Sequence, residues 1–338
     1  MSAKINLDRL AQLEPLVGRA LAGSKRALSR MITLAENDDD MRLEISRRIY
    51  PHAGGAYLIG ITGPPGSGKS TLTDKLTKHL RGMDYTVGIV AVDPSSPFSG
   101  GAILGDRIRM NDLALDEKVY IRSMATRGHL GGLSSAVESA ARIMDASGCD
   151  FILIETVGVG QSEVEIMEIA DTTLVVSVPG LGDDIQMIKA GILEIGDVLV
   201  VNKADRDGAE ELANQLRTMQ QLDTTKCDAP DAWVSPVVLT SAERNTGIRE
   251  LWAEIERHRN TCIGNDTYLA TRKERIRREV RALLLDETAK LVFERMDIEE
   301  LLEATLPDLY ARTVNPFDWV QERTSDLEIA LDRGKESF

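Results

Sequence analysis

The stretch Tyr57-Leu-Ile-Gly-Ile-Thr-Gly-Pro-Pro-Gly-Ser-Gly-Lys-Ser70 decides the fold of this chain. Residues 57–62 form an apolar run of strand length, and residues 63–70 complete the pattern GxxxxGK(S/T). Residues 71–80 then repeat apolar side chains at helical spacing. A strand, a glycine-rich loop and a helix in this order are typical of a phosphate-binding P-loop. They disfavour the alternative, a surface turn rich in glycine and proline.

The residue types of this loop suit a triphosphate. Glycines let successive backbone N–H groups turn toward the β-phosphate, because no Cβ stands in the way. The helix that begins near Lys69 adds the positive end of its dipole. We expect Lys69 to neutralise the β- and γ-phosphates and the Ser70 hydroxyl to ligate Mg²⁺. The expected nucleotide contacts are Gly63, Pro64, Pro65, Gly66, Ser67, Gly68, Lys69, Ser70 and Thr71.

Short runs of Val, Ile and Leu recur between helical stretches on both sides of this loop. Continuous apolar runs are typical of strands buried on both faces, and their alternation with helices favours a parallel sheet. Strands are expected at 57–62, 87–92, 119–122, 151–155, 174–178, 197–201 and 237–240. The predicted fold class is α/β, a P-loop NTPase with a mainly parallel central sheet and helical N-terminal and C-terminal extensions.

Three zones follow from the spacing of apolar residues. Residues 1–50 have helical spacing and are expected to be a small N-terminal extension. Residues 51–262 carry the βα units of the P-loop domain. Residues 263–338 are rich in helix formers and are expected to be helical. Their apolar side chains could pack on the P-loop domain or form a dimer interface. These side chains include Leu283, Leu284, Leu285, Leu291, Val292, Leu301 and Leu302.

A second motif indicates that the base is guanine. Asn202-Lys203-Ala204-Asp205 has the form NKxD and follows an apolar run, where ligands bind at the carboxyl ends of parallel strands. The Asp205 carboxylate can only accept hydrogen bonds, which guanine N1–H and its amino group can donate and adenine cannot. Lys203 can lay its stem over the base. One strand later, Ser241 and Ala242 follow, and the Ala242 N–H is expected to donate to guanine O6.

A third set of residues is expected at the metal and the γ-phosphate. Glu155 ends a buried apolar run, and residues 155–158 read ETVG where GTPases usually carry DxxG. Glu155 could hold Mg²⁺ directly or through water, and the Gly158 N–H could contact the γ-phosphate. Asp93 ends another strand, and Asp106 lies in the loop that follows. The predicted metal ligands are Ser70, Asp93, Asp106 and Glu155.

The hydrolytic machinery is incomplete in the sequence. Val159 follows Gly158 at the place where Ras-like GTPases carry the glutamine that orients water. Slow intrinsic hydrolysis is therefore expected, with the site completed by a partner or a moving loop. The local candidates for this task are Gln161, Arg107, Arg109 and Lys189.

Composition excludes several functions. The net charge of -14 argues against a nucleic acid or an anionic membrane as partner. Cys149, Cys227 and Cys262 are far apart, so free thiols are expected rather than disulfides or zinc ligands. No apolar run is long enough to span a bilayer and none resembles a secretory signal. The protein is expected in the cytoplasm or in an organelle matrix.

Several longer stretches resemble one known family. GPPGSGKST, VDPSSPFSGGAILGDRIRM, TRGHLGGL, ETVGVGQSE, PGLGDDIQMIKAGILEIGD and NKAD are similar to the MeaB/ArgK-type GTPases, which belong to the SIMIBI class of P-loop proteins. The resemblance runs through most of residues 55–250. Helical zones at both ends extend it to nearly the whole chain.

This resemblance implies a homodimeric GTPase that acts as a chaperone of the adenosylcobalamin-dependent methylmalonyl-CoA mutase. GTP binding and hydrolysis would gate cofactor delivery and protect or reactivate the mutase. The resemblance assigns metal and catalytic positions to Ser70, Asp93, Asp106 and Glu155, and it makes Lys189 a switch lysine. The loop at 179–189 would be the mobile switch, and the C-terminal zone would be the dimerisation arm.

Three alternatives remain for comparison. A kinase would pass the γ-phosphate to an amino acid or a protein, but the sequence has no recognisable second base or acceptor pocket. A metal insertase of the same class usually has His-rich or Cys-rich tracts, whereas the four histidines here are isolated. A signal-recognition GTPase needs a Met-rich basic domain, and this chain is acidic.

Overall fold

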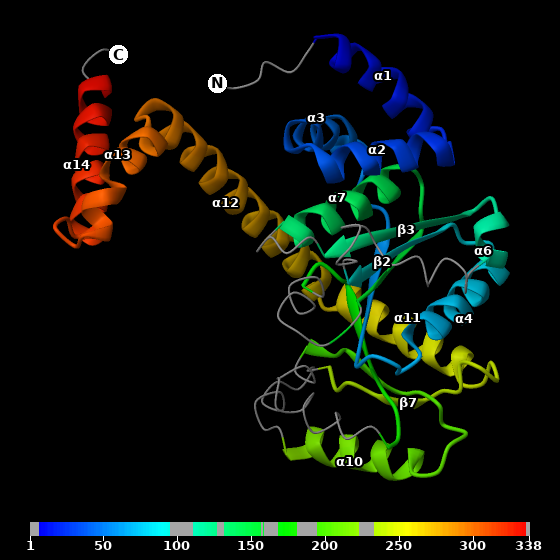
Figure 1. The fold of residues 1–338 in the computed structure, drawn as a ribbon. Helices are drawn as coiled ribbons and strands as arrows, with labels where there is room; N and C mark the ends of the chain where they lie inside the picture. Colours follow the sequence, from blue (N-terminus) through cyan, green and yellow to red (C-terminus); the bar gives the residue numbers. More distant parts are fainter. Residues whose placement is uncertain are drawn as a thin grey trace. The chain divides into compact units, whose positions relative to one another are not determined.

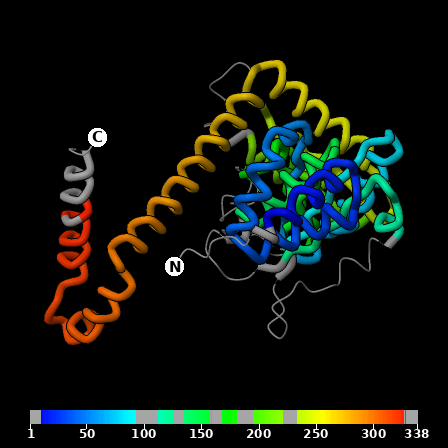
Figure 2. Tube along the Cα trace, turned by 90° about the horizontal axis from the view of Figure 1, so that it is seen from above, coloured from blue at the N-terminus to red at the C-terminus, as the bar shows by residue number. Residues whose placement is uncertain are grey.

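The computed structural model describes residues 7–94, 111–126, 132–156, 158, 168–180, 195–222 and 233–335 (Figures 1 and 2). Contacts divide the chain into two compact units, one running through Tyr268 and the other beginning at Leu269. Within the described ranges, no helix combines the length and the apolar character that crossing a bilayer requires.

The first unit is built on a sheet of seven parallel strands in the order β3-β2-β4-β1-β5-β6-β7. The strands are β1 (Tyr57–Thr62), β2 (Val87–Pro94), β3 (Val119–Thr126), β4 (Phe151–Glu155), β5 (Thr172–Ser177), β6 (Val198–Val201) and β7 (Val237–Leu239). The α/β class and all seven strands are confirmed, and the sheet is entirely rather than mainly parallel. β3 is longer than its apolar run because it pairs with β2 from Val119 to Thr126.

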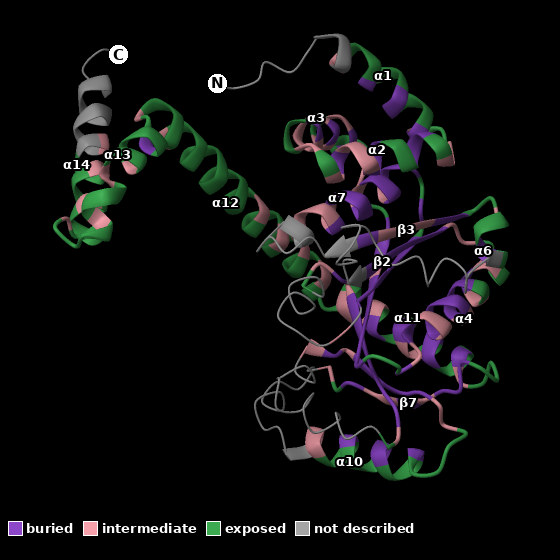
Figure 3. Cartoon of the chain, viewed as in Figure 1, coloured by how far each residue is buried: buried purple, intermediate pink, exposed green. Residues whose placement is uncertain are grey.

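Helices cover both faces of this sheet. One face packs against α4 (Lys69–Gly82) and α11 (Ile248–Gly264), and the opposite face packs against α7 (Gly132–Ala146) and α10 (Ala209–Leu222). Alternate strand residues serve the two faces, so Ile89 joins the α4 side and Val90 joins the α7 side. Figure 3 shows the resulting buried sheet. The short helix α6 (Asn111–Leu115) precedes β3.

The N-terminal helices add an outer layer beyond α7. These are α1 (Leu7–Leu21), α2 (Lys25–Asn37) and α3 (Asp39–Ile49), followed by the 3₁₀ turn η1 (Tyr50–His52). Ser24 and Asp38 cap α2 and α3 by accepting backbone N–H groups. Arg122 of β3 forms an ion pair with Glu36 of α2, which links this layer to the edge of the sheet.

The second unit consists of helices α12 (Thr267–Arg295, which begins within the first unit), α13 (Ile298–Tyr310) and α14 (Pro316–Lys335). Among the side chains that the structure describes in these helices, Ile298 is the single apolar one that is buried. Large apolar side chains are exposed instead. They include Ile276, Val280, Leu283, Leu284, Leu285, Leu291, Phe293, Leu301 and Leu306.

Candidate nucleotide site

The P-loop lies between the carboxyl end of β1 and the start of α4. Three of its glycines have positive φ angles, 148° at Gly63, 78° at Gly66 and 88° at Gly68. A Cβ on Gly63 would lie 2.2 Å from the carbonyl oxygen of Val176, so only glycine fits there. The loop therefore packs directly onto the end of β5.

Lys69 is almost fully buried at the first turn of α4. Its Nζ donates to the carbonyl oxygens of Gly63 at 2.7 Å and Pro64 at 3.0 Å. These bonds hold the ammonium group under the loop. An unpaired buried ammonium would be costly, so the loop carbonyls stabilise the charge beside the place where phosphates would lie.

Ser70 and Glu155 meet at the carboxyl end of β4. The Ser70 hydroxyl donates to Glu155 Oε1 at 2.5 Å, and the Thr73 hydroxyl lies 3.1 Å from Oε2. Glu155 is buried and Thr73 fully so. Thr73 did not stand out in the sequence, because a threonine within a helical pattern carries no signal of a partner on a distant strand.

Asp93 and Gly158 lie at the same edge of the sheet. Asp93 is two residues beyond Ala91, which is the register partner of Glu155 across β2 and β4. The carbonyl oxygen of Gly158 accepts a 3.1 Å hydrogen bond from the Thr62 hydroxyl at the end of β1. The segment after Glu155 is thereby tied to the strand that leads into the P-loop.

Other predicted residues lie outside the described part of the chain. They are Asp106, Lys189 and the candidates for positioning water, Arg107, Arg109 and Gln161. Within the described residues, no group of three or more His, Cys, Asp or Glu side chains could hold a metal ion. Cys149 and Cys262 are free thiols, and burial raises the pKa of Cys149 well above its usual range.

The NKxD loop joins the P-loop through Asn202. Its side-chain N–H₂ donates to the carbonyl oxygen of Ser67 at 2.8 Å. Its Oδ1 accepts from the Thr240 hydroxyl and from the Ala242 N–H, both at 3.1 Å. The Ala242 N–H expected to face guanine O6 is therefore bonded to Asn202 in this structure.

Lys203 and Asp205 extend the same loop. Lys203 has a positive φ of 57° and donates through Nζ to the carbonyl oxygen of Gly66 at 2.7 Å. The Ser241 hydroxyl donates to Asp205 Oδ1 at 2.6 Å, and Arg244 lies 3.3 Å from Oδ2. The Ser241 hydrogen bond, helped by the charge of Arg244, holds the pKa of Asp205 below its usual range. The carboxylate is thus kept ionised as a hydrogen-bond acceptor.

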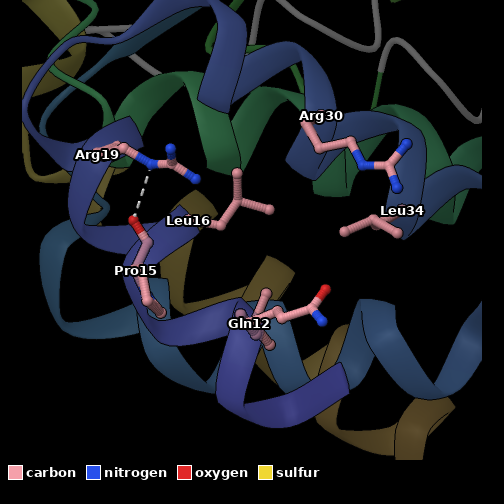
Figure 4. A pocket seen from close by; sticks show the side chains of 7 residues that line it. Gln12, Pro15, Leu16, Arg19, Arg30 and Leu34 are labelled. Carbon is pink, nitrogen blue, oxygen red and sulfur yellow. Dashed lines mark hydrogen bonds between the residues drawn. The ribbon is translucent and has the colours of Figure 1, made fainter. Parts of the chain in front are cut away.

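A cavity of about 420 Å³ lies away from these loops, between α1 and α2 (Figure 4). Arg19 and Arg30 lie on either side of it, with Leu16 between them. Its lining residues are Gln12, Leu13, Pro15, Leu16, Arg19, Arg30 and Leu34. No residue of the P-loop or of the NKxD loop lines this cavity, so it is separate from the candidate nucleotide site.

The fold of this chain is similar to that of a solved structure. A crystal structure described as LAO/AO transport system kinase has a TM-score of 0.68 and 24% identity, covering 96% of this chain and 100% of the other. At that identity the likeness speaks for the fold alone. The fold and the two loops define the class: an α/β P-loop GTPase with helical N- and C-terminal regions.

The chain belongs to the family of methylmalonyl-CoA mutase-associated GTPases of the MeaB type, whose family model matches residues 28–297. A Pyrococcus abyssi protein with a provisional GTPase name is 48% identical over 293 residues, which cover 86% of this chain and 90% of that protein. Escherichia coli GTPase ArgK is 32% identical over 310 residues, or 90% of this chain and 94% of that protein. The mouse mitochondrial methylmalonic aciduria type A homolog is 31% identical over 272 residues, covering 74% and 64%. The resemblance and the GTPase activity inferred from the sequence are confirmed.

Proposed function

We propose that this protein is a GTP-hydrolysing chaperone of the adenosylcobalamin-dependent methylmalonyl-CoA mutase. GTP binding and hydrolysis would gate cofactor delivery and would protect or reactivate the mutase. The family name, which associates its members with that mutase, supports this partner. The observation that carries the proposal is the hydrogen bond from Asn202 to Ser67, because it makes the phosphate loop and the base loop one connected site.

In this proposal residues 63–71 bind the triphosphate through backbone N–H groups and Lys69. Asp205 accepts hydrogen bonds from the guanine edge, and Ser241 keeps its carboxylate oriented. Asn202 braces the two loops, and Lys203 covers the base with its stem. Ala242 would turn its N–H from Asn202 Oδ1 toward guanine O6 when the nucleotide enters.

The residues at the end of β4 also fit Mg²⁺. The ion prefers oxygen ligands, and it commonly takes one or two from carboxylates with the rest from phosphates and water. Ser70 and Glu155 bring a hydroxyl and a carboxylate together at 2.5 Å beside the P-loop. We assign the metal to Ser70 and Glu155, with Asp93 and Asp106 as further ligands or water-positioning acids. A bound Mg²⁺ would supply charge neutralisation between the β- and γ-phosphates.

Gating follows from the connection between the γ-phosphate region and the segments beyond it. Gly158 is bound to Thr62, so a change at the γ-phosphate would be felt both by β1 and by the chain after β4. Residues 179–189, with Lys189, are proposed as the switch that reports the nucleotide to the mutase.

The C-terminal helices are proposed as the dimerisation arm, with residues 1–50 and 51–262 as the helical extension and the GTPase domain. Exposed apolar side chains on α12 and α13 support this role, because large exposed apolar patches commonly mark interfaces between proteins. Light scattering at micromolar concentration tests it, and a monomer there would contradict a homodimer.

The central experiment is GTP turnover with and without the mutase. We expect slow release of phosphate alone and an increase of at least about tenfold with the mutase, since a partner completes the hydrolytic site. Lys69→Ala serves as the nucleotide-binding control and should abolish turnover in both conditions. Unchanged turnover with the mutase would contradict the chaperone role, and transfer of phosphate to a protein or an amino acid would favour the kinase alternative.

A further inference from the structure

The contact between Thr73 and Glu155 has no counterpart in the sequence motifs. Thr73 lies on α4, three residues after Ser70, and residues three or four apart share one face of a helix. Ser70 and Thr73 therefore face β4 together, and each hydroxyl reaches a different oxygen of the Glu155 carboxylate, Oε1 at 2.5 Å and Oε2 at 3.1 Å. Both oxygens of the carboxylate therefore contact hydroxyl groups of the same helix, α4.

Both Glu155 and Thr73 are buried, so the loss of their hydrogen bond would not be made good by water. Glu155 is 5% exposed and Thr73 is 0% exposed, so water cannot easily replace the threonine hydroxyl. A buried carboxylate oxygen that loses a donor either remains poorly solvated or turns toward another donor. Such a rotation of the carboxylate would also move Oε1, the oxygen that faces Ser70.

The glutamate itself explains why a second partner is needed. It stands where GTPases usually carry aspartate in DxxG, and its side chain is one methylene longer. The additional torsion gives the carboxylate more orientations, and each must be restricted if the group is to serve a metal with strict geometry.

We infer that Thr73 is a positioning residue that orients Glu155 toward the magnesium site at Ser70. This inference rests on the proposed role of Ser70 and Glu155 at Mg²⁺. Thr73 would act through the carboxylate rather than by contacting the nucleotide or the metal, as outer-shell partners of metal ligands do.

A purely helical role for the hydroxyl is the competing explanation. Thr73 Oγ1 also lies 2.9 Å from the carbonyl oxygen of Lys69. In this alternative the hydroxyl donates to that backbone oxygen and not to Glu155. The carboxylate is the stronger acceptor because it is charged. The two explanations differ in one measurable property, since only the positioning role makes Mg²⁺ binding depend on the hydroxyl.

Thr77 provides a matched control. It lies one turn further along α4, is equally buried at 0% exposure, and its hydroxyl has no hydrogen-bond partner among the described residues. Thr77→Val and Thr73→Val make the same chemical change on the same helix. The former removes a hydroxyl that contacts no acceptor, so any effect common to both variants belongs to packing.

The experiment measures release of a fluorescent GDP analogue from the full chain while free Mg²⁺ is titrated. Thr73→Val should need about tenfold more Mg²⁺ for half-maximal slowing of release. Thr73→Ser and Thr77→Val should stay within about twofold of the wild type, since serine keeps the hydroxyl. Release after chelation with EDTA should be the same in all four proteins, because the nucleotide contacts themselves are unchanged.

A double-mutant cycle with Glu155→Asp completes the test. The aspartate side chain is one methylene shorter, so its carboxylate should not reach both hydroxyls, and Thr73→Val should cause no further loss of Mg²⁺ affinity in that background. The positioning role alone would be overturned if Thr73→Val needed the same Mg²⁺ concentration as the wild type. It would also be overturned if Thr77→Val lost as much Mg²⁺ affinity as Thr73→Val. Release that is insensitive to Mg²⁺ in the wild type would instead overturn the proposed metal site.

Discussion

The side-chain amide of Asn202 donates a 2.8 Å hydrogen bond to the carbonyl oxygen of Ser67, 135 residues earlier in the chain. The same amide accepts hydrogen bonds from Thr240 and Ala242 through its oxygen. One buried side chain thus holds three loops, which follow β1, β6 and β7. The P-loop and the NKxD loop are therefore joined by one side chain.

Removing this brace should weaken the whole site. Asn202→Ala removes the amide that bonds the Ser67 carbonyl oxygen and the Thr240 hydroxyl, so the loops lose their connection, at a cost of about 1–3 kcal/mol. GTP affinity should fall by roughly 5- to 150-fold, measured by titration calorimetry. Asn214→Ala is the control, because Asn214 is exposed on α10 and bonds only its own helix. Equal affinities of Asn202→Ala and the wild type would contradict the brace.

Gly63 should tolerate no side chain. In Gly63→Ala the new Cβ would lie 2.2 Å from the Val176 carbonyl oxygen, so the loop must move away from β5. We expect a loss of at least about 2 kcal/mol of unfolding free energy, together with loss of GTP binding. Gly82→Ala is the control, because nothing lies within 4 Å of its Cβ position and its φ is not positive. Urea unfolding compares the two, and equal midpoints would refute the steric argument.

Base selectivity should depend on Asp205. Asp205→Asn replaces one acceptor oxygen with a donor, which faces the donors of guanine unfavourably and suits the C2 carbonyl of xanthine. GTP affinity should drop by about 10- to 100-fold while xanthosine triphosphate binds more tightly than to the wild type. The exposed neighbour provides the control as Asp207→Asn, which should leave both affinities unchanged. A panel of nucleotide affinities decides the matter, and unchanged GTP preference in Asp205→Asn would exclude its role at the base.

Stability should fall in mild acid because of His258. It is buried on α11, with Nδ1 2.8 Å from the Thr172 hydroxyl and Nε2 3.4 Å from Asp197. Burial lowers its pKa below the ordinary value of 6.5, although the charge of Asp197 opposes the shift. The unfolded chain therefore takes up a proton first as pH falls below 6.5. The unfolding free energy then decreases until the pH reaches the pKa of the folded state.

The corresponding measurement is the unfolding free energy between pH 7 and about pH 5.5. The loss in the wild type can reach about 1.4 kcal/mol for each pH unit of this window. His258→Gln should flatten the slope, whereas His52→Gln, at an exposed position in η1, should leave it as in the wild type. The same slope in His258→Gln as in the wild type would assign the acid sensitivity to other groups.

Short sequence patterns predicted the strands and the two loop motifs of this protein. The glycine pattern at 63–70, the apolar runs of the strands and the NKxD letters are each contained in a few consecutive residues. The run at Phe151–Glu155 is a buried strand because every side chain in it but the last is apolar. Strand ends were predicted less accurately, as at β3, where pairing with β2 carries the strand beyond Arg122 to Thr126.

The sequence by itself determined the α/β class, the P-loop motif and the NKxD motif, because backbone conformation and hydrogen-bonding chemistry of this kind are encoded locally. Only the tertiary structure decided that Glu155 lies against Thr73, 82 residues away, and that Asn202 reaches Ser67. Those contacts depend on the strand order, which sets β4 and β5 on either side of β1 and so gathers distant loops at one edge. No spacing along the chain records that order, since it results from how the helices and strands pack as a whole.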